Sequence, residues 1–325
     1  MKALVQDHFG PPSSLRLEDV DEPRPAPGEV VVEVHASSLN PYDWHMLRGD
    51  PRVARLMGGP GMARPRHRVA GADVAGVVVG VGPGVDDVTV GDEVVGYGFG
   101  AFAERVATPA RLVVPKPPGL SMAEAATLPT AGTTGVRAVR DVGGVRQGDR
   151  VLVNGAAGGV GSMAVQAARS AGAEVVAVCS AANADLALRL GASRVVAHDR
   201  DDITRDVGGY DVVLDNVGNH GLRAMRRLAT ADGTLCLNAG LGPGRWIGAV
   251  RPMLTAALLD RFVRQRLRPV PTRWDGEEVR ALLQRVTRGE VRPVLEDRTD
   301  LAGVPQALAR LERGHTRGKV AVVLR

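Results

Sequence analysis

The chain has 325 residues, of which 44% are hydrophobic, so it can bury a large core and by length forms roughly two domains. Its net charge of +5 comes from 41 basic and 36 acidic residues mixed along the chain, and only 3% of residues are aromatic. This composition argues against a nucleic-acid-binding surface, and no apolar run is long enough to span a membrane.

The first block of sequence, up to about residue 118, contains short apolar runs separated by Pro and Gly turns. These runs cover residues 29–36, 73–82, 91–98 and 104–114. Short strands with frequent turns predict an all-β, barrel-like unit. Because the chain begins with a strand-like MKALVQ instead of an apolar or amphipathic leader, we expect a cytoplasmic protein.

From residue 121 onward, helical and strand-like periods alternate, which is typical of βαβ units in a doubly wound parallel sheet. The strand-like runs cover residues 151–155, 174–180, 194–198, 211–218 and 233–240.

After about residue 271, two amphipathic helices are predicted over 276–289 and 301–314. The final strand, 318–324, then needs a sheet to join. The segment 242–267 has apolar residues at helical spacing. It could pack in the core, line a substrate pocket, or form the surface of a homodimer.

A glycine-rich turn follows the strand 151–155 and leads directly into a helix, in VLVNGAAGGVGSMAVQAA. Glycine lets the backbone approach a pyrophosphate closely, and the helix N-terminus offers free N–H groups to it. This context favours a dinucleotide site over a structural turn. The predicted cofactor contacts are Gly155, Ala157, Gly158, Gly159 and Val160.

The second strand of this region ends at Ser180 and is followed by Asn183, with no acid before Asp185. An NAD site usually has a carboxylate at this place, which would repel the 2′-phosphate of NADP. We therefore predict NADPH in preference to NADH, with Ser180 and Asn183 as contacts.

The stretch SLNPYDWHMLRG, residues 38–49, gathers Asn40, Tyr42, Asp43 and His45 around a proline. It could be a catalytic constellation, the remains of a metal site, or a polar turn. The stretch alone does not distinguish these possibilities.

Several motifs together resemble the medium-chain dehydrogenase/reductase superfamily, most closely its zinc-independent quinone and enone reductases, which include the reticulon-interacting and alkenal/one reductase-like proteins. They are SLNPYDWHMLRG, DVAGVVVGVGPGV, VTVGDEVVG, GAFAERV, NGAAGGVGSMAVQAA, YDVVLDNVG and LERGHTRGKVAVV. The resemblance implies a GroES-like β-barrel catalytic domain over 1–120, completed by 272–325. It also implies a Rossmann domain over 121–271.

The resemblance implies that no zinc is bound. Zinc-dependent relatives have a Cys where Asn40 stands, a His-Glu pair where Ala72 and Asp73 stand, and a later Cys in the region of 129–135, which has none here. Zinc normally needs at least three protein ligands.

The resemblance also places site residues. Asn40 should face the nicotinamide and hold a substrate oxygen, and His45 either gives a proton or only packs near the ribose. Asp43 should orient the loop or His45, and Tyr42 could bind a substrate oxygen. The further cofactor contacts are Thr134, His198, Val217, Gly218, Asn238, Ala239, Gly240 and Lys319.

These observations predict an NADPH-dependent, zinc-independent reductase that transfers hydride to an enone or a quinone, with this small molecule as its only partner apart from a possible second copy. One alternative is a tailoring enoyl or keto reductase for a single polyketide-like substrate. Another is a non-catalytic NADPH-binding scaffold or sensor.

Overall fold

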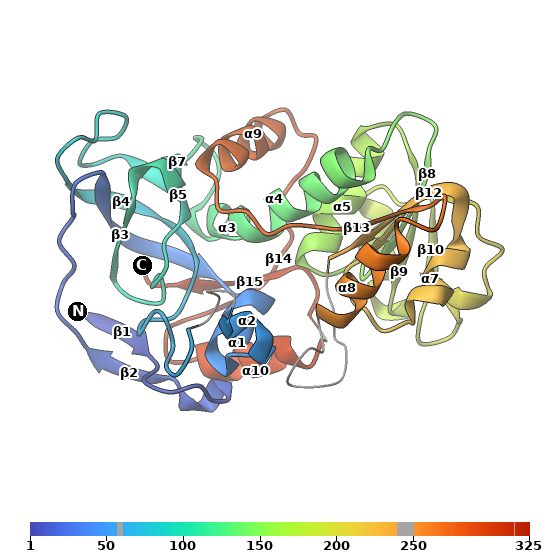
Figure 1. Ribbon diagram of the computed structural model, residues 1–325. Coiled ribbons are helices and arrows are strands. Elements are labelled where there is room, and N and C mark those ends of the chain that lie inside the picture. The colour runs from blue at the N-terminus through green and yellow to red at the C-terminus, as the bar shows by residue number, and fades with distance from the viewer. Residues whose placement is uncertain (57–60, 239–249, 315) are drawn as a thin grey trace. The chain divides into compact units, whose positions relative to one another are not determined.

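The computed structural model describes residues 1–56, 61–238, 250–314 and 316–325 (Figure 1). The chain divides into two compact units. Unit 1 comprises Met1–Thr133, Trp274–Thr287 and Pro293–Arg325, and unit 2 comprises Thr134–Arg273 and Arg288–Arg292. Among the described helices, none combines the length and the apolar character needed to cross a bilayer.

Unit 1 is built around a seven-stranded sheet, in the order β14-β15-β3-β4-β5-β7, with β6 paired to β3. A separate pair, β1 and β2, is antiparallel. The strands are β1 (Lys2–Val5), β2 (Arg16–Asp19), β3 (Glu29–Ser38), β4 (Asp73–Val81), β5 (Glu93–Tyr97), β6 (Arg105–Pro109), β7 (Val113–Pro115), β14 (Leu295–Thr299) and β15 (Lys319–Val323).

The C-terminal strand, β15, joins the sheet of unit 1, as the sequence predicts. β15 pairs antiparallel with β3, with Ala321 opposite Ser38 (Figure 1). Alternation along β3 buries Val30, Val32 and Val34 in one core cluster with valines of β4, β5 and β6. The end of β3 therefore lies beside the first residues of both β15 and β4, which brings distant segments of the chain together.

The helices of unit 1 are α1 (Pro41–Arg48), α2 (Arg52–Leu56), α3 (Met122–Ala126), α9 (Gly276–Thr287) and α10 (Val304–Glu312). The stretch 38–49 is therefore not a simple turn, because α1 begins inside it. Asn40 is the extended N-cap, Pro41 is the first helical residue, and Gly49 ends the helix with a φ of 61°. Short 3-10 turns, η1 (Pro12–Ser14) and η2 (Ala110–Leu112), complete the unit.

Unit 2 contains a six-stranded parallel sheet in the order β10-β9-β8-β11-β12-β13. Its strands are β8 (Arg150–Asn154), β9 (Glu174–Cys179), β10 (Arg194–Ala197), β11 (Tyr210–Asp215), β12 (Ala229–Leu237) and β13 (Arg266–Pro269). The helices between them are α5 (Gly159–Ser170), α6 (Ala184–Arg189), α7 (Leu222–Leu228) and α8 (Val250–Leu259). The predicted class, a barrel-like sheet together with a doubly wound parallel sheet, is confirmed.

The order of the strands in the sheet of unit 2 predicts where a nucleotide-binding crevice lies. The chain moves outward from β8 to β9 and β10, and then returns to the other side for β11, β12 and β13. Parallel strands that diverge in this way leave a crevice at their carboxyl ends. Here the crevice lies at the ends of β8 and β11, directly before the glycine-rich turn.

The first passage of the chain from unit 1 to unit 2 lies inside a helix. The helix α4 (Pro129–Arg137) begins in unit 1 and continues in unit 2 as the π-helical η3 (Ala138–Gly143).

The helix α8 packs Ala256 into the core of unit 2, while Leu254, Leu258 and Phe262 are exposed. The segment 242–267 thus contributes to the core in its described part, and residues 242–249 lie outside the described residues.

Candidate active site

A buried polar network in unit 1 centres on Asn40, Asp73 and Lys319. These residues follow β3, begin β4 and begin β15, so the neighbouring strand ends bring them together. The ammonium of Lys319 donates to Oδ1 of Asn40 at 2.5 Å, and the Asn40 amide donates to Oδ2 of Asp73 at 2.8 Å. Their exposed fractions are only 1% for Asn40, 0% for Asp73 and 4% for Lys319. We call this group the Lys319 network.

Further hydrogen bonds satisfy the Asp73 carboxylate. Ser38 donates its hydroxyl to Oδ2 at 2.7 Å, and Thr130 donates its hydroxyl to Oδ1 at 2.6 Å. The ammonium of Lys319 lies 3.9 Å from Oδ2 and also donates to the Leu39 carbonyl at 2.6 Å. A buried charge is tolerated when it is paired and hydrogen-bonded in this way.

This geometry revises two expected roles. The Asn40 amide gives one hydrogen to Asp73 and points another at the Ser38 carbonyl, and its oxygen is taken by Lys319. Asn40 therefore has little capacity left to hold a substrate oxygen. Lys319, expected as a cofactor contact, instead bonds the chain segment that carries Asn40.

Asp43 has an unusual environment beside this network. Its Oδ2 accepts the Asn40 backbone N–H at 2.7 Å, which fixes the start of α1 and contacts Asn40 rather than His45. Its Oδ1 is buried and has no hydrogen-bond partner among the described residues. Burial, together with the charge of Asp73, raises the pKa of Asp43 to about 8. At neutral pH Asp43 is therefore mostly protonated. Burial also lowers the pKa of Lys319.

His45 lies on α1 and is stacked on Trp44, with ring centroids 3.6 Å apart. Its Nδ1 is 3.0 Å from the Asp50 carbonyl oxygen, which can only accept, so Nδ1 carries the hydrogen. Burial lowers the pKa of His45, so the ring is neutral near pH 7 and Nε2 has no proton to give. The environment favours a packing role over proton delivery.

Aromatic side chains gather elsewhere in unit 1. Trp274 makes edge contacts with Tyr42, Tyr97 and Phe99, with ring centroids 4.9, 5.0 and 5.1 Å away. His67 stacks on Phe99 at 5.3 Å. We call these five residues the aromatic cluster. Tyr97 is fully buried, whereas Tyr42, Phe99 and Trp274 are half-buried.

Tyr42 is the member of this cluster that the sequence singles out. Burial raises its pKa to about 12, so the phenol is protonated at neutral pH. No hydrogen bond joins its hydroxyl to another described side chain or backbone group. The hydroxyl can therefore donate to a bound molecule.

In unit 2 the glycine-rich turn has the shape of a phosphate cradle. Gly155 has a φ of 76°, and a Cβ added to it would lie 2.7 Å from Val217. A Cβ on Gly161 would lie 2.1 Å from the Gly155 carbonyl oxygen. Gly158, the N-cap of α5, makes no side-chain cap, so the first N–H groups of the helix face the turn without one. These features fit a pyrophosphate group.

A second polar network lies at the strand ends of unit 2. The Asn154 amide donates to Oδ1 of Asp215 at 2.9 Å, and the same oxygen accepts the backbone N–H groups of Val217 and Gly218 at 3.1 and 2.9 Å. The backbone N–H groups of Val217 and Gly218 already donate to Asp215. Only other atoms of these two residues are therefore left to contact a cofactor. Asp215 and Asn154 are organising residues that the sequence does not reveal, because their partners are 61 positions apart.

The Asn238 side chain donates to Oδ1 of Asn216 at 2.8 Å, and Asn216 in turn donates to the Asn154 carbonyl at 3.1 Å. Asn238 therefore lies beside the other strand ends, and its contact with a cofactor stays a prediction. Thr134 is also part of unit 2 and is buried within α4. The predicted contacts Ala239 and Gly240 lie outside the described residues.

The loop after β9 holds the predicted ribose-side residues. Asn183 donates to the Ser180 hydroxyl at 3.1 Å, which leaves both facing the same turn. A carboxylate from the segment after β10 also contacts this loop. Asp199 accepts the Ala181 N–H at 2.8 Å. That bond holds the pKa of Asp199 below its usual range, so it is charged, and exposed His198 and Arg200 flank it. Asp199 is not apparent from the sequence as a member of this loop, because it follows β10 instead of β9.

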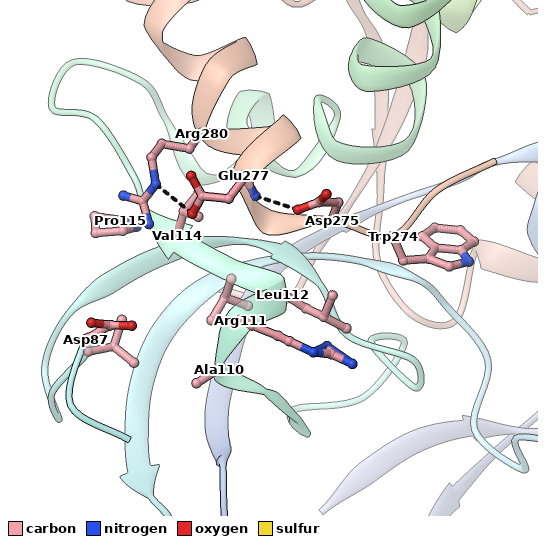
Figure 2. A pocket seen from close by; sticks show the side chains of 12 residues that line it. Asp87, Ala110, Arg111, Leu112, Val114, Pro115, Trp274, Asp275, Glu277 and Arg280 are labelled. Atoms are coloured by element: carbon pink, nitrogen blue, oxygen red, sulfur yellow. Dashed lines mark hydrogen bonds and ion pairs between the residues drawn. The ribbon is translucent and has the colours of Figure 1, made fainter. Parts of the chain in front are cut away.

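A pocket of about 800 Å³ lies on unit 1 between the β7 region and α9 (Figure 2). At its rim Arg280 donates to Glu277 at 3.3 Å, and Asp275 accepts the Glu277 backbone N–H at 2.9 Å. None of its lining residues is among the predicted site residues. The pocket shares only Trp274 with the aromatic cluster, and we assign it no role.

The donor set around Asn40 does not fit zinc. In the part of the chain that the structure describes, no three His, Cys, Asp or Glu residues are grouped so that they could hold a metal. Within the Lys319 network, an ammonium already bonds the Asn40 oxygen and lies beside Asp73. A carboxylate and an amide, with a lysine ammonium bonded to the amide oxygen, do not make a zinc site. The expectation that no zinc binds stays a prediction.

Two sequence families match the chain. Residues 26–118 match the alcohol dehydrogenase GroES-like domain, and residues 190–322 match the zinc-binding dehydrogenase family.

Individual relatives match over most of the chain. The mitochondrial NAD(P)H oxidoreductase RTN4IP1 of Mus musculus is 31% identical over 91% of this chain and 82% of its own length. The chloroplast envelope quinone oxidoreductase homolog of Arabidopsis thaliana is 30% identical over 99% of this chain and 98% of its own length. The spectinabilin polyketide synthase system protein NorB of Streptomyces orinoci is 35% identical over 79% of this chain, but over only 12% of its own length.

Solved structures agree with the observed architecture. The quinone oxidoreductase of Coxiella burnetii has a TM-score of 0.87 and 30% identity, covering 100% of this chain and 99% of its own. A mycobacterial protein, Rv1454c, solved in complex with NADPH, has a TM-score of 0.85 and 29% identity, with 100% of both chains covered.

Proposed function

Because the chain belongs to the medium-chain dehydrogenase/reductase superfamily, in its quinone oxidoreductase branch, we propose that it is a zinc-independent reductase of conjugated enones and quinones that uses NADPH. The chain is an NAD(P)H-dependent oxidoreductase of the quinone oxidoreductase type. The preference for NADPH, the independence from zinc and the class of acceptor are the proposal.

The Lys319 network carries this proposal. Its ammonium bonds the Asn40 oxygen and lies beside Asp73, which supports the proposal that no metal binds there. Without a Lewis acid, the alkoxide of a simple alcohol is poorly stabilised, which disfavours alcohol oxidation. A conjugated enone or a quinone delocalises the charge that hydride addition creates. Hydrogen-bond donors and a proton source then suffice.

The cradle of unit 2 would hold the cofactor. The turn from Gly155 to Gly161 and the start of α5 suit the pyrophosphate, and the strand-end network of Asp215 and Asn238 suits the nicotinamide end. When bound, NADPH supplies the hydride. The absence of an acid directly after β9 supports NADPH, and so does the similarity to a mycobacterial protein solved with NADPH.

Tyr42 is our candidate for the proton donor. Its hydroxyl is protonated at neutral pH and can donate to an enolate oxygen; burial raises its pKa to about 12, which makes it a weaker acid than a free tyrosine. Asn40, Asp43 and Lys319 would fix the loop before α1 and thereby position Tyr42. His45 is neutral and bonds the Asp50 carbonyl, so it would pack beside the site without giving a proton.

A second candidate substrate is a polyketide-like enone, because the chain is 35% identical to part of a polyketide synthase system protein. The reaction would be the same, with a dedicated acyl substrate. A comparison of kcat/KM for a conjugated enoyl thioester and for simple enones would separate the two. Selectivity of more than a hundredfold for the thioester would support the dedicated role.

The direct test mixes the purified protein with NADPH and a panel of enones, quinones, aldehydes and alcohols, with and without a zinc chelator. We expect consumption of NADPH with enones or quinones, slower turnover with NADH, and no effect of the chelator. Loss of activity in the chelator would refute the zinc-independent mechanism. NADPH binding without turnover of any acceptor would refute the enzymatic role and leave a cofactor-binding protein.

A further inference from the structure

We propose that Asp43 is a positioning residue that carries a proton while the reductase is active, and that loss of this proton at mildly alkaline pH loosens the start of α1 and stops the reaction reversibly. This inference rests on the proposed function, because Tyr42, the candidate proton donor, is the neighbour of Asp43 on α1. It names a regulation of that same site.

Two buried carboxyl groups bond the same residue, Asn40. Oδ2 of Asp73 accepts its side-chain amide at 2.8 Å, and Oδ2 of Asp43 accepts its backbone N–H at 2.7 Å. The exposed fractions are 0% for Asp73 and 4% for Asp43. Among the described residues, the two carboxyl groups share one ammonium, that of Lys319. One ammonium balances one carboxylate, so a second negative charge in this interior is uncompensated.

The hydrogen bonds decide which of the two carboxyl groups keeps the charge. Asp73 accepts two from Thr130, at 2.6 and 3.1 Å. It accepts two more from Ser38 and Asn40, at 2.7 and 2.8 Å. Asp43 accepts one, and its Oδ1 is buried with no partner in the part of the chain that the structure describes. Because donors favour the charged form, Asp73 is the carboxylate and Asp43 the neutral acid.

The other titratable groups around Asp43 agree with this assignment. Burial, with the charge of Asp73, raises the pKa of Asp43 to about 8. Tyr42 has a pKa raised to about 12 and stays neutral in this range. Burial lowers the pKa of His45, which is neutral as well. Burial also lowers the pKa of Lys319, but a negative charge on Asp43 attracts its proton and opposes that loss. Asp43 therefore releases its proton first as the pH rises.

Ionisation of Asp43 disrupts the packing at the start of α1. The new charge on Oδ1 meets no donor, and a buried charge without a partner is costly. Water reaches this oxygen only when the first turn of α1 moves, and that turn holds Asn40, as the N-cap, and Tyr42. The far end of α1 is held separately, by the ion pair of Arg48 with Glu312 of α10. The loosening is therefore confined to the end that carries Tyr42.

The test follows the proton and the helix apart from turnover. Infrared difference spectra of the full-length wild type between pH 7 and pH 9 report the carbonyl band of a protonated carboxylic acid. Hydrogen exchange, read by mass spectrometry and corrected for the intrinsic effect of pH, compares α1 with α5. Initial rates with NADPH and a conjugated enone give kcat and KM over the same range.

The variant is Asp43→Asn, because an amide has the shape of the neutral acid and does not titrate. The matched control is Asp19→Asn, which removes an exposed acid of β2 that pairs with Lys2. Each protein is compared with its own value at pH 7, so a lower activity of a variant does not affect the comparison.

We expect the acid band in the wild type at pH 7, its loss with a midpoint near pH 8, and its absence from Asp43→Asn. Exchange of α1 should rise at least about threefold between pH 7 and pH 9, while that of α5 stays constant. In the wild type and in Asp19→Asn, kcat at pH 9 should be about a tenth of its value at pH 7, with NADPH affinity unchanged and recovery on return. In Asp43→Asn, kcat should fall by less than about twofold.

A wild type without the acid band at pH 7, or a fall in kcat that Asp43→Asn shares in full, would overturn the proposal. The wild-type spectra and exchange rates decide the matter even where the variant fails to fold. Among the described residues, Asp43 is the carboxyl group whose pKa burial raises, so the band has one source.

Failure of the proposed function gives a different pattern. If the acid band and the exchange of α1 change as expected but no acceptor is reduced, the proton on Asp43 stands and the reductase proposal fails. If enones are reduced with NADPH at a kcat that is the same at pH 7 and pH 9, the reductase stands and this inference fails.

Discussion

The ammonium of Lys319 donates a hydrogen bond of 2.5 Å to the side-chain oxygen of Asn40, which lies 279 positions away in the sequence. This contact links the last strand of the chain to the loop that precedes α1. It places a buried cation beside Asp73 and leaves the Asn40 amide fully engaged. The hydrogen bonding of Asn40 and the charge balance at Asp73 therefore depend on this contact.

Replacing Lys319 with Met should destabilise unit 1 strongly. The substitution leaves the buried Asp73 charge and the Asn40 oxygen without their cation, and breaking a buried pair costs about 3–5 kcal/mol. Unfolding in urea measures the loss. The control is Lys2→Met, whose exposed pair with Asp19 should contribute little to stability. Similar small losses in both variants would contradict a buried ion pair.

Replacing Asp43 with Asn should change how stability depends on pH. In the folded chain the pKa of Asp43 is raised from 3.8 to about 8, chiefly by burial. Between these values the folded chain keeps a proton that the unfolded chain releases, so the free energy of unfolding falls as pH rises. Asp43→Asn removes this dependence and should gain relative to the wild type between pH 5 and 8, by up to about 1.4 kcal/mol per pH unit.

A suitable control for this experiment is Asp19→Asn. The pKa of Asp19 is lowered by its hydrogen bond to Lys2, so any stability it contributes is lost only as pH falls through the acid range. Its difference from the wild type should stay constant between pH 5 and 8. Parallel curves for Asp43→Asn and the wild type in that window would show that Asp43 is ionised in the folded chain.

Replacing Tyr42 with Phe should lower kcat for enone reduction by about a hundredfold, in the range of a lost general acid. The ring is kept, so binding of the enone should weaken only modestly and NADPH affinity should not change. By contrast, His45→Gln should change kcat by less than about threefold and leave the pH profile intact, since His45 is neutral. The reverse ranking of the two variants would return the proton-donor role to His45.

Replacing Asp199 with Asn should increase the preference for NADPH over NADH. Asp199 is charged and holds the Ala181 N–H in the loop after β9. If the 2′-phosphate binds at this loop, removal of the charge should lower the Kd of NADPH several-fold with little change for NADH. Calorimetric titration with each cofactor measures this. An equal change for both cofactors would place the 2′-phosphate away from Asp199.

Much of the fold could be predicted from the sequence, because local patterns specify it. Alternating apolar residues in β3, the short buried strands of unit 2 and the glycines before α5 all depend on near neighbours. The helix α1 was missed because Asn40 and Pro41 are typical of turns as well as of helix starts. Its capping carboxylate, Asp43, could have been noticed three residues after the N-cap.

The candidate site was less accessible to sequence reasoning, because its contacts join distant segments. Asp73 stands where zinc-dependent relatives have a metal ligand, but its role depends on Lys319 and Thr130, 246 and 57 positions away. Trp274 has no local signal at all, and only the fold brings it to Tyr42. Asp199 reaches its loop from the neighbouring strand.

The central claim is that this chain moves a hydride from NADPH to the acceptor and that the proton comes separately. The most direct measurement incubates the protein with a conjugated enone and NADPH that carries deuterium at both C4 positions, in ordinary water, and locates the label in the product by mass spectrometry and NMR. The account predicts a single deuterium on the β-carbon and ordinary hydrogen on the α-carbon. A product without deuterium, or no product at all, would contradict it.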